Sequence, residues 1–127
     1  TKIAKGCSTG ALVGGDNIML SPNLFICFAK ARMISPDCRC RSFDQRANGY
    51  ARGEGVGMVF LRPLEDALKD GNPVFATLRG SAVNHGGRSA SLTAPSGPAQ
   101  QAVIVACLGQ AGVQPHEVTI LEAHGTG

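Results

Sequence analysis

Short apolar runs that suit β-strands alternate with segments that suit helices, and this alternation limits the possible folds more than any other feature. Strands are expected at 11–13, 56–61, 74–83 and 118–121, and helices at 22–33, 63–69 and 97–111. The first strand is expected to end in a tight turn at Gly14-Gly15, and 56–61 to be buried. Alternating strands and helices form layered α/β folds, whose chemistry gathers at the carboxyl ends of strands.

Local capping residues support two of these helices. Ser21 precedes Pro22, a pair typical of an N-cap followed by the first helical residue. Ser96 precedes Gly97-Pro98 in the same way, and Gly112 is placed to stop that helix after Ala111. The first helix carries apolar residues at helical spacing, at Phe25, Phe28, Ala29 and Met33, until Ser35-Pro36-Asp37 ends it.

A glycine-rich stretch at 53–57 resembles a nucleotide-binding loop only superficially. Such a loop follows a strand and opens a helix, so that the helix N-terminus meets phosphate. Here an expected strand follows the glycines instead. The stretch is therefore interpreted as a structural turn.

The charge is mildly positive overall but uneven along the chain. The net charge of +3 is too small to indicate nucleic-acid binding. The segment from Lys30 to Arg52 holds six basic residues against only Asp37 and Asp44. A solvated basic face is the simpler interpretation, and a contact surface for an acidic or phosphate-bearing partner is the alternative.

Cysteine usage and hydropathy bear on compartment. The five cysteines are an odd number without a secretory signal, which favours a reducing compartment, the cytoplasm or alternatively an organelle. Only Cys38 and Cys40 lie close together, and no second pair completes a zinc site, so no metal is expected. No apolar run approaches the length of about 20 residues that crosses a bilayer, so no membrane contact is expected.

His124 is the strongest candidate for chemistry. It follows the last expected strand and is flanked by Gly125 and Gly127, small neighbours that let a substrate approach closely. A structural histidine fits the same pattern equally well. His85 and His116 are expected to be surface or loop residues. No Gly-x-Ser-x-Gly elbow is present, so the residues alone indicate an α/β segment with one candidate catalytic histidine.

Several stretches taken together resemble the ketosynthase (beta-ketoacyl synthase) family. They are 14–22, 33–37, 42–44, 48–55, 79–84, 92–98 and 122–127, in the order and spacing of that family. Thr93-Ala94-Pro95 together with Arg52-Gly53-Glu54-Gly55 resembles modular (type I) polyketide synthases more than stand-alone fatty-acid condensing enzymes. Gly86 departs from the family, where an Asp is usual, and this affects only the order of the local loop.

The resemblance implies a thiolase-like fold made of two similar α/β halves. The chain is expected to span the end of the N-terminal half, at about 1–60, and the start of the C-terminal half, at about 61–127. It would thus hold parts of two sheets and the whole of neither, with strand edges and apolar faces uncovered. Poor folding in isolation is expected, and a partial domain cut from a longer chain is the favoured interpretation.

The resemblance also implies an acyltransferase that performs a decarboxylative Claisen condensation between an acyl-cysteine thioester and a malonyl-type carrier thioester. His124 matches the first of two histidines that bind the extender carbonyl. Thr126 is expected to shape the pantetheine side, and Phe25 and Phe28 to line the acyl pocket, although ordinary core packing fits both phenylalanines. The nucleophilic cysteine and the second histidine match no residue here, so the chain alone is expected to be inactive.

The implied partners are an acyl carrier domain, which brings the phosphopantetheine, and a second ketosynthase copy in a homodimer. No cofactor is expected to bind the chain directly. The alternatives are a fatty-acid condensing enzyme and a ketosynthase-like decarboxylase or scaffold domain. The residue at the nucleophile position distinguishes the last of these, because a Gln or Ala there would support it.

Overall fold

The computed structural model describes residues 6, 8–87, 89 and 94–126. The chain divides into two compact units, each built from two stretches of sequence. One unit comprises Gly10–Leu61 with Glu122–Gly127, and the other comprises Thr1–Thr9 with Arg62–Leu121. Of the quoted motifs, 92–93 and Gly127 lie outside the described residues.

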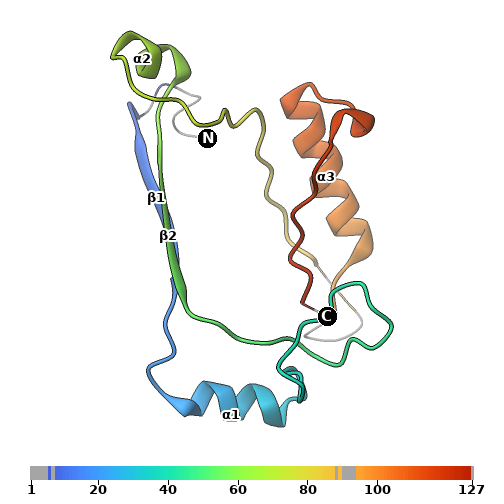
Figure 1. The fold of residues 1–127 in the computed structure, drawn as a ribbon. Helices are drawn as coiled ribbons and strands as arrows, with labels where there is room; N and C mark the ends of the chain where they lie inside the picture. Colours follow the sequence, from blue (N-terminus) through green and yellow to red (C-terminus); the bar gives the residue numbers. More distant parts are fainter. Residues whose placement is uncertain (1–5, 7, 88, 90–93, 127) are drawn as a thin grey trace. The chain divides into compact units, whose positions relative to one another are not determined.

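The first unit is built on one antiparallel pair of strands (Figure 1). Strand β1 (Ala11–Asn17) pairs with β2 (Gly55–Leu61), with Ala11 opposite Leu61 and Asn17 opposite Gly55. The expected turn at Gly14-Gly15 is wrong, because both glycines continue β1 and pair with β2. A Cβ at Gly14 would lie 3.0 Å from the Gly57 carbonyl oxygen, so a larger residue would crowd the partner strand at this close approach.

Helix α1 (Pro22–Lys30) follows β1 and begins as the sequence predicts. The Ser21 side chain accepts a hydrogen bond from the Asn23 N–H at 3.2 Å, and Pro22 occupies the first turn. The helix ends earlier than expected, so that Met33 lies beyond it. The reason is a change of backbone direction at Arg32, which has a φ of 56° outside the helical region.

The second unit holds the remaining helices. Helix α2 (Leu64–Lys69) lies between Arg62 and Asp70, which form an ion pair of 2.7 Å. Helix α3 (Gly97–Ala111) begins with Ser96 as N-cap and stops at Gly112, whose φ is 62°, both as predicted. A short 3₁₀ helix, η1 (Pro115–Glu117), follows and was not expected.

The expected strands at 74–83 and 118–121 are absent from the structure. Both segments are described without regular secondary structure. The first of them lies along α3, where the Ser81 N–H donates to Gln110 Oε1 at 2.8 Å and Asn84 Nδ2 donates to the Ala99 carbonyl at 2.6 Å. Neither segment has a neighbouring strand among the described residues. A β-strand forms only when its backbone makes hydrogen bonds to such a neighbour.

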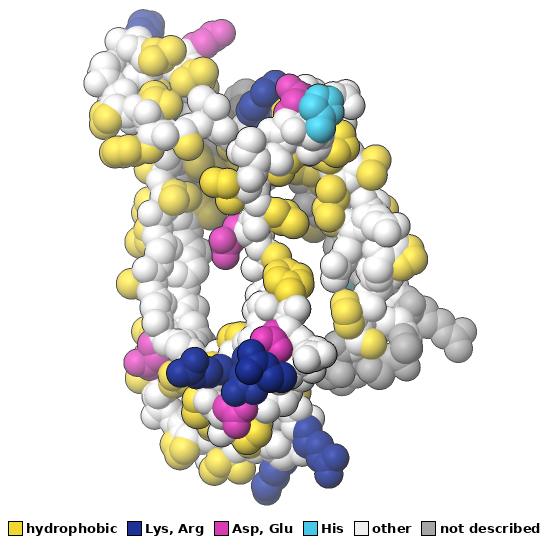
Figure 2. All heavy atoms as spheres, turned by 45° about the vertical axis from the view of Figure 1, so that its right-hand side comes forward, with side chains coloured by type: hydrophobic (Ala, Val, Ile, Leu, Met, Phe, Trp, Pro, Cys, Tyr) yellow, Lys and Arg dark blue, Asp and Glu magenta, His cyan; other side chains and the backbone are white. Residues whose placement is uncertain are grey.

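Few of the described residues are buried. Ala67 and Ser35 are the buried residues among those described, whereas Val56 of the expected buried strand is 77% exposed and Phe60 is 66% exposed. Figure 2 shows apolar side chains spread over the face in view. The expectation of a buried 56–61 strand is therefore wrong for this chain, while uncovered apolar faces agree with a partial domain.

Candidate active site

His124 lies in an irregular segment, 122–126, that belongs to the first unit. The expectation that it follows a strand is wrong, because 118–121 forms none. His124 and Thr126 are exposed, and Gly125 between them has a φ of 50°. Among the described residues, no hydrogen bond reaches the His124 imidazole.

A long loop of the same unit, residues 34–50, contacts this segment. The Ser42 hydroxyl donates a hydrogen bond to the Gly125 carbonyl oxygen, across 83 residues of sequence. Gly125 and the Ser42 side chain are closely packed. A Cβ at Gly125 would lie 3.1 Å from Ser42 Oγ and 3.3 Å from Ser42 Cβ. The histidine-bearing turn is therefore fitted to the loop around Ser42.

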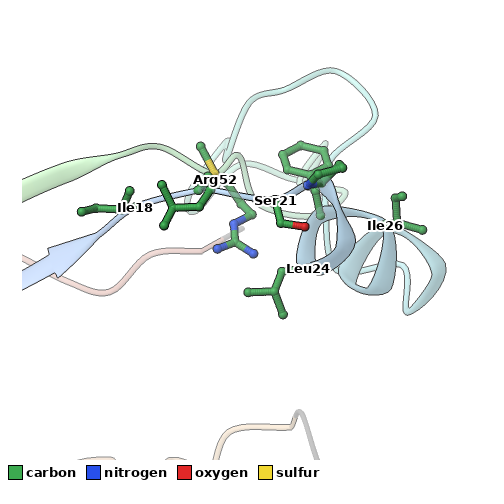
Figure 3. A pocket seen from close by; sticks show the side chains of 9 residues that line it. Ile18, Ser21, Leu24, Ile26 and Arg52 are labelled. Carbon is green, nitrogen blue, oxygen red and sulfur yellow. The ribbon is translucent and has the colours of Figure 1, made fainter.

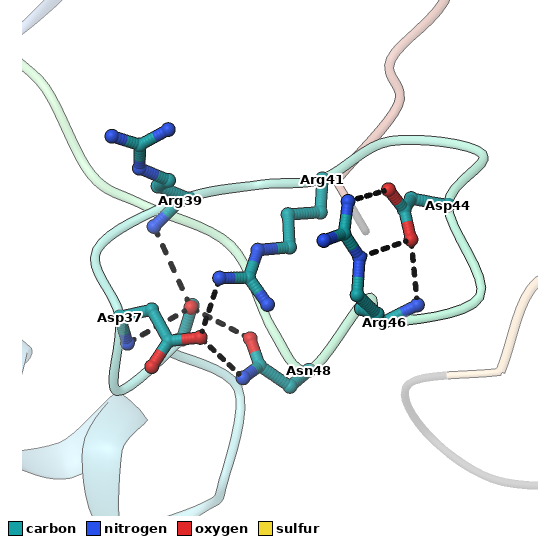
Figure 4. Close-up of polar contacts among 7 residues, drawn as sticks. Asp37, Arg39, Arg41, Asp44, Arg46 and Asn48 are labelled. Carbon is teal, nitrogen blue, oxygen red and sulfur yellow. Dashed lines mark hydrogen bonds and ion pairs between the residues drawn. The ribbon is translucent and has the colours of Figure 1, made fainter.

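Ion pairs give that loop its shape (Figure 4). Arg41 Nη2 lies 3.0 Å from Asp37 Oδ2, and Arg46 Nη2 lies 2.7 Å from Asp44 Oδ2. Hydrogen bonds from the Arg46 side chain and backbone lower the pKa of the Asp44 carboxyl from 3.8 to about 2, and the same pair raises the pKa of Arg46. Two cations of the basic stretch are thus paired within it.

The base of the loop is closed by a buried serine, Ser35. Ser35 is 1% exposed, and its hydroxyl donates to Asn48 Oδ1 at 2.7 Å while accepting from the Asp37 N–H at 3.2 Å. Asn48 Nδ2 also donates to Asp37 Oδ2 at 3.1 Å. A bridge between Ile34 and Tyr50 completes the closure. The loop is thereby tied at its base and along its length.

An apolar groove of about 530 Å³ lies beside the start of α1 (Figure 3). Phe25 is one of the residues that line it. The other lining residues are Ile18, Met19, Leu20, Ser21, Pro22, Leu24, Ile26 and Arg52. Two hydrogen bonds join the end of β1 and the segment after it to the residues just before β2. Asn17 Nδ2 donates to the Gly53 carbonyl oxygen, and the Met19 N–H donates to Glu54 Oε1 at 2.5 Å. The expected structural turn at 53–57 is wrong for its last three residues, because Gly55, Val56 and Gly57 already belong to β2. A strand rather than a helix follows Glu54, as the sequence predicts.

Phe28 faces a different neighbour. The Arg52 guanidinium carbon lies 4.9 Å from the centre of the Phe28 ring, a cation–π contact. Phe28 is half-buried and does not line the groove that Phe25 borders. One Arg52 guanidinium nitrogen is buried without a hydrogen-bond partner among the described residues. Phe25 therefore lines the groove itself, whereas Phe28 lies outside it and contacts Arg52, which is one of the lining residues.

The remaining candidates lie apart from this site. Cys27, Cys38, Cys40 and Cys107 are free thiols, and Cys7 lies outside the described residues. No cluster of metal-ligating side chains occurs in the described part of the chain. His85 and His116 are exposed, as expected. Within the same described part, no helix is long and apolar enough to cross a membrane.

Sequence reasoning missed Ser42 as a site residue. Ser42 stood inside a family motif, but no local pattern indicates that its hydroxyl reaches residue 125. Its ion-paired neighbours carried a weak signal. Asp37 and Arg41 are four residues apart, and Asp44 and Arg46 are two residues apart, so both pairs are local in the sequence.

Family models match nearly the whole chain. The N-terminal domain of beta-ketoacyl synthase matches residues 1–67, and the C-terminal domain of the same family matches residues 75–127. The two matches together define the class of protein as a beta-ketoacyl synthase domain. The chain belongs to the beta-ketoacyl synthase family, which confirms the resemblance drawn from the motifs.

The relatives narrow the class to polyketide synthases. Polyketide synthase ThaG of Burkholderia thailandensis is 52% identical over 117 residues, which is 92% of this chain and 2% of that protein. Highly reducing polyketide synthase poxF of Penicillium oxalicum is 43% identical over 125 residues, which is 98% of this chain and 5% of that protein. The chain thus spans a small fraction of these relatives.

Solved ketosynthases share the backbone. The oxazolomycin ketosynthase domain OzmH KS7 of Streptomyces albus JA3453 matches with a TM-score of 0.95 at 40% identity, over 99% of this chain and 22% of that one. The ketosynthase from module 6 of the bacillaene synthase of Bacillus subtilis 168 matches with a TM-score of 0.95 at 34% identity, over 98% and 23%. The described residues therefore form part of a thiolase-like fold, as predicted.

Proposed function

We propose that the chain is the central segment of a ketosynthase domain that extends an acyl chain by decarboxylative condensation. The observation that carries the proposal is the exposed turn at 122–126, in a chain that belongs to the beta-ketoacyl synthase family. This turn presents a histidine whose ring nitrogens have no partner among the described residues. A hydrogen-bond donor aimed at a substrate needs that freedom.

The proposed reaction has two stages. A cysteine thiolate first attacks an acyl thioester, and the carbon–sulfur bond to the pantetheine thiolate breaks. A malonyl-type thioester then loses carbon dioxide, and the electron pair of the broken carbon–carbon bond forms an enolate. The enolate carbon attacks the acyl-cysteine carbonyl and expels the cysteine thiolate. None of the cysteines in this chain matches the nucleophile, so the first stage depends on residues other than these 127.

His124 has its proposed role in the second stage. Negative charge gathers on the extender thioester oxygen as carbon dioxide leaves. An N–H of the His124 ring would donate a hydrogen bond to that oxygen and lower the energy of the enolate, together with a second histidine outside the chain. Flanking glycine at position 125 supports the proposal, because a turn without a bulky side chain lets the pantetheine thioester approach the imidazole.

The other site residues would bind the two ends of the substrates. Thr126, adjacent to the turn, would contact the pantetheine side. Phe25 and Phe28 would contact the acyl chain, and the apolar groove beside Phe25 supports this role more directly than the Arg52 contact of Phe28 does. An apolar groove of about 530 Å³ suits a hydrocarbon chain better than a charged ligand.

The proposed partners follow from the substrates. An acyl carrier domain would deliver both thioesters on a phosphopantetheine arm, with no cofactor bound directly to this chain. A second ketosynthase copy would complete a homodimer and cover apolar side chains that are exposed here. The free thiols of Cys27, Cys38, Cys40 and Cys107 suit a reducing compartment, for which we propose the cytoplasm.

The test begins with the gene sequence on both sides of this chain, followed by expression of the complete domain. His124→Ala is expected to lower condensation about 10²-fold or more, because it removes an oxyanion donor. His116→Ala is the matched control, since His116 is exposed and lies in the other unit. Unchanged condensation in His124→Ala would refute the proposal. A Gln or Ala at the nucleophile position would instead indicate a decarboxylase or scaffold domain.

A further inference from the structure

Ser42 stands where a long loop touches the histidine-bearing turn. Its hydroxyl donates to the Gly125 carbonyl oxygen, which belongs to the peptide group between Gly125 and Thr126. That peptide group lies one residue beyond His124. Holding it restricts the rotation of the turn, and with it the direction in which the His124 imidazole points.

The backbone around Ser42 is held in a costly conformation. Arg41 has a φ of 47° and Phe43 has a φ of 63°, so the residues on both sides of Ser42 lie in the left-handed region. Non-glycine residues in this region cost about 1 kcal/mol or more each and persist only where surrounding contacts enforce them. Phe43 is 92% exposed, so burial of its own ring does not offset the cost.

The enforcing contacts lie in the same loop. The Arg41 ion pair with Asp37 holds the residue before Ser42, and the Asp44 pair with Arg46 holds the turn after it (Figure 4). In addition, the Asp44 N–H donates to the Arg41 carbonyl at 3.0 Å, which closes a turn with Ser42 and Phe43 as its central residues. The loop thus presents the Ser42 hydroxyl at a defined position.

The turn at 122–126 has no comparable support of its own. Among the described residues of that turn, the contact between Gly125 and Ser42 is the hydrogen bond that joins it to the rest of its unit. Gly125 has a φ of 50°, so its backbone also occupies the left-handed region, which glycine tolerates but does not prefer strongly. An outside contact is therefore needed to select one conformation of the turn.

We propose that Ser42 is a positioning residue for His124, acting through its hydrogen bond to the Gly125 carbonyl. The inference rests on the proposed function of His124. It predicts that, without the Ser42 hydroxyl, the His124 imidazole no longer points in the direction that the reaction needs. Small errors of position at a reacting group lower rates by factors of about ten to a hundred.

The experiment separates the two half-reactions of the complete ketosynthase domain. Acylation of the nucleophilic cysteine is followed by mass spectrometry, and decarboxylation of a malonyl carrier thioester by release of carbon dioxide. Ser42→Ala is expected to lower the kcat of decarboxylation about tenfold, while acylation stays within about twofold of wild type. Ser42→Thr keeps a hydroxyl and is expected to restore most of the decarboxylation rate. Gln45→Ala, an exposed residue of the same loop, is the control.

Two results would overturn the inference. One is a wild-type decarboxylation rate in Ser42→Ala. The other is an equal loss of acylation and decarboxylation that Ser42→Thr does not restore, which would indicate general damage to the fold. Failure of the proposed function is distinguished by His124→Ala, because unchanged decarboxylation in that variant refutes the histidine's role whatever Ser42 does.

Discussion

The backbone of Gly49 passes so close to Ser35 that no side chain fits between them. A Cβ on Gly49 would lie 2.5 Å from the Ser35 backbone nitrogen, and the φ of Gly49 is 128°. The two stretches of chain that meet here also exchange hydrogen bonds, from the Ser35 N–H to the Tyr50 carbonyl and from the Tyr50 N–H to the Met33 carbonyl, each 3.0 Å long. This contact closes the base of the loop that carries Ser42.

Gly49→Ala is therefore expected to open the base of the loop. The new methyl group meets backbone rather than a side chain that can turn aside, and the φ of Gly49 is unfavourable for alanine. A loss of about 2 kcal/mol or more in the free energy of unfolding is expected for the complete domain. Denaturant titration measures it, with Gly53→Ala as control because nothing lies within 4 Å of a Cβ at Gly53. Equal stability of the two variants would contradict this account.

The Asp44–Arg46 pair predicts a pH dependence of stability. The pKa of Asp44 falls from 3.8 to about 2 in the folded chain, so its contribution is fully present above about pH 4 and is lost as the pH falls toward 2. Wild type and Asp44→Asn are compared by their denaturant midpoints from pH 7 down to pH 3. The difference between them should be constant at higher pH and shrink below about pH 4. A difference that grows on acidification has the wrong sign and would exclude the pair as the cause.

Gly125→Ala tests the fit between the turn and the loop. The new Cβ would lie 3.1 Å from Ser42 Oγ, and the alanine would have to adopt a φ of 50°. Decarboxylation in the complete domain is expected to fall about tenfold or more. Ser42→Gly removes the crowding atoms but not the φ penalty, so the double variant should lose less than the sum of the two single losses. Additive losses would show that the two positions act independently.

The groove beside Phe25 predicts an effect on substrate choice. Phe25→Ala enlarges the groove, so the ratio of kcat/KM for long over short acyl thioesters is expected to rise about tenfold. Competition between acyl thioesters of different length, measured on the complete domain, gives this ratio directly. Phe43→Ala is the matched control, because Phe43 is exposed in the loop and does not line the groove. An unchanged ratio in Phe25→Ala would remove Phe25 from the acyl site.

Local signals predicted the helices well. Ser21 caps α1 and Ser96 caps α3, and Gly112 ends α3 in a left-handed conformation, all through contacts between residues a few positions apart. The strands were predicted less well. The 56–61 run is a strand because it finds β1 as its partner, whereas 74–83 finds no strand among the described residues. Apolar composition favours a strand, but pairing with a second segment decides whether one forms.

The family, the helix caps and the candidate histidine could all be predicted from the amino-acid sequence, because motifs and caps depend on the residue types at short, fixed spacings. The contacts that hold the turn around that histidine became visible only in the folded chain. The Ser42 hydroxyl meets the Gly125 carbonyl across 83 residues, and the Gly49 backbone meets Ser35 where the loop closes. Contacts of this kind form where the fold brings together residues that are far apart in the sequence. A local pattern of side chains does not predict which distant residues will meet.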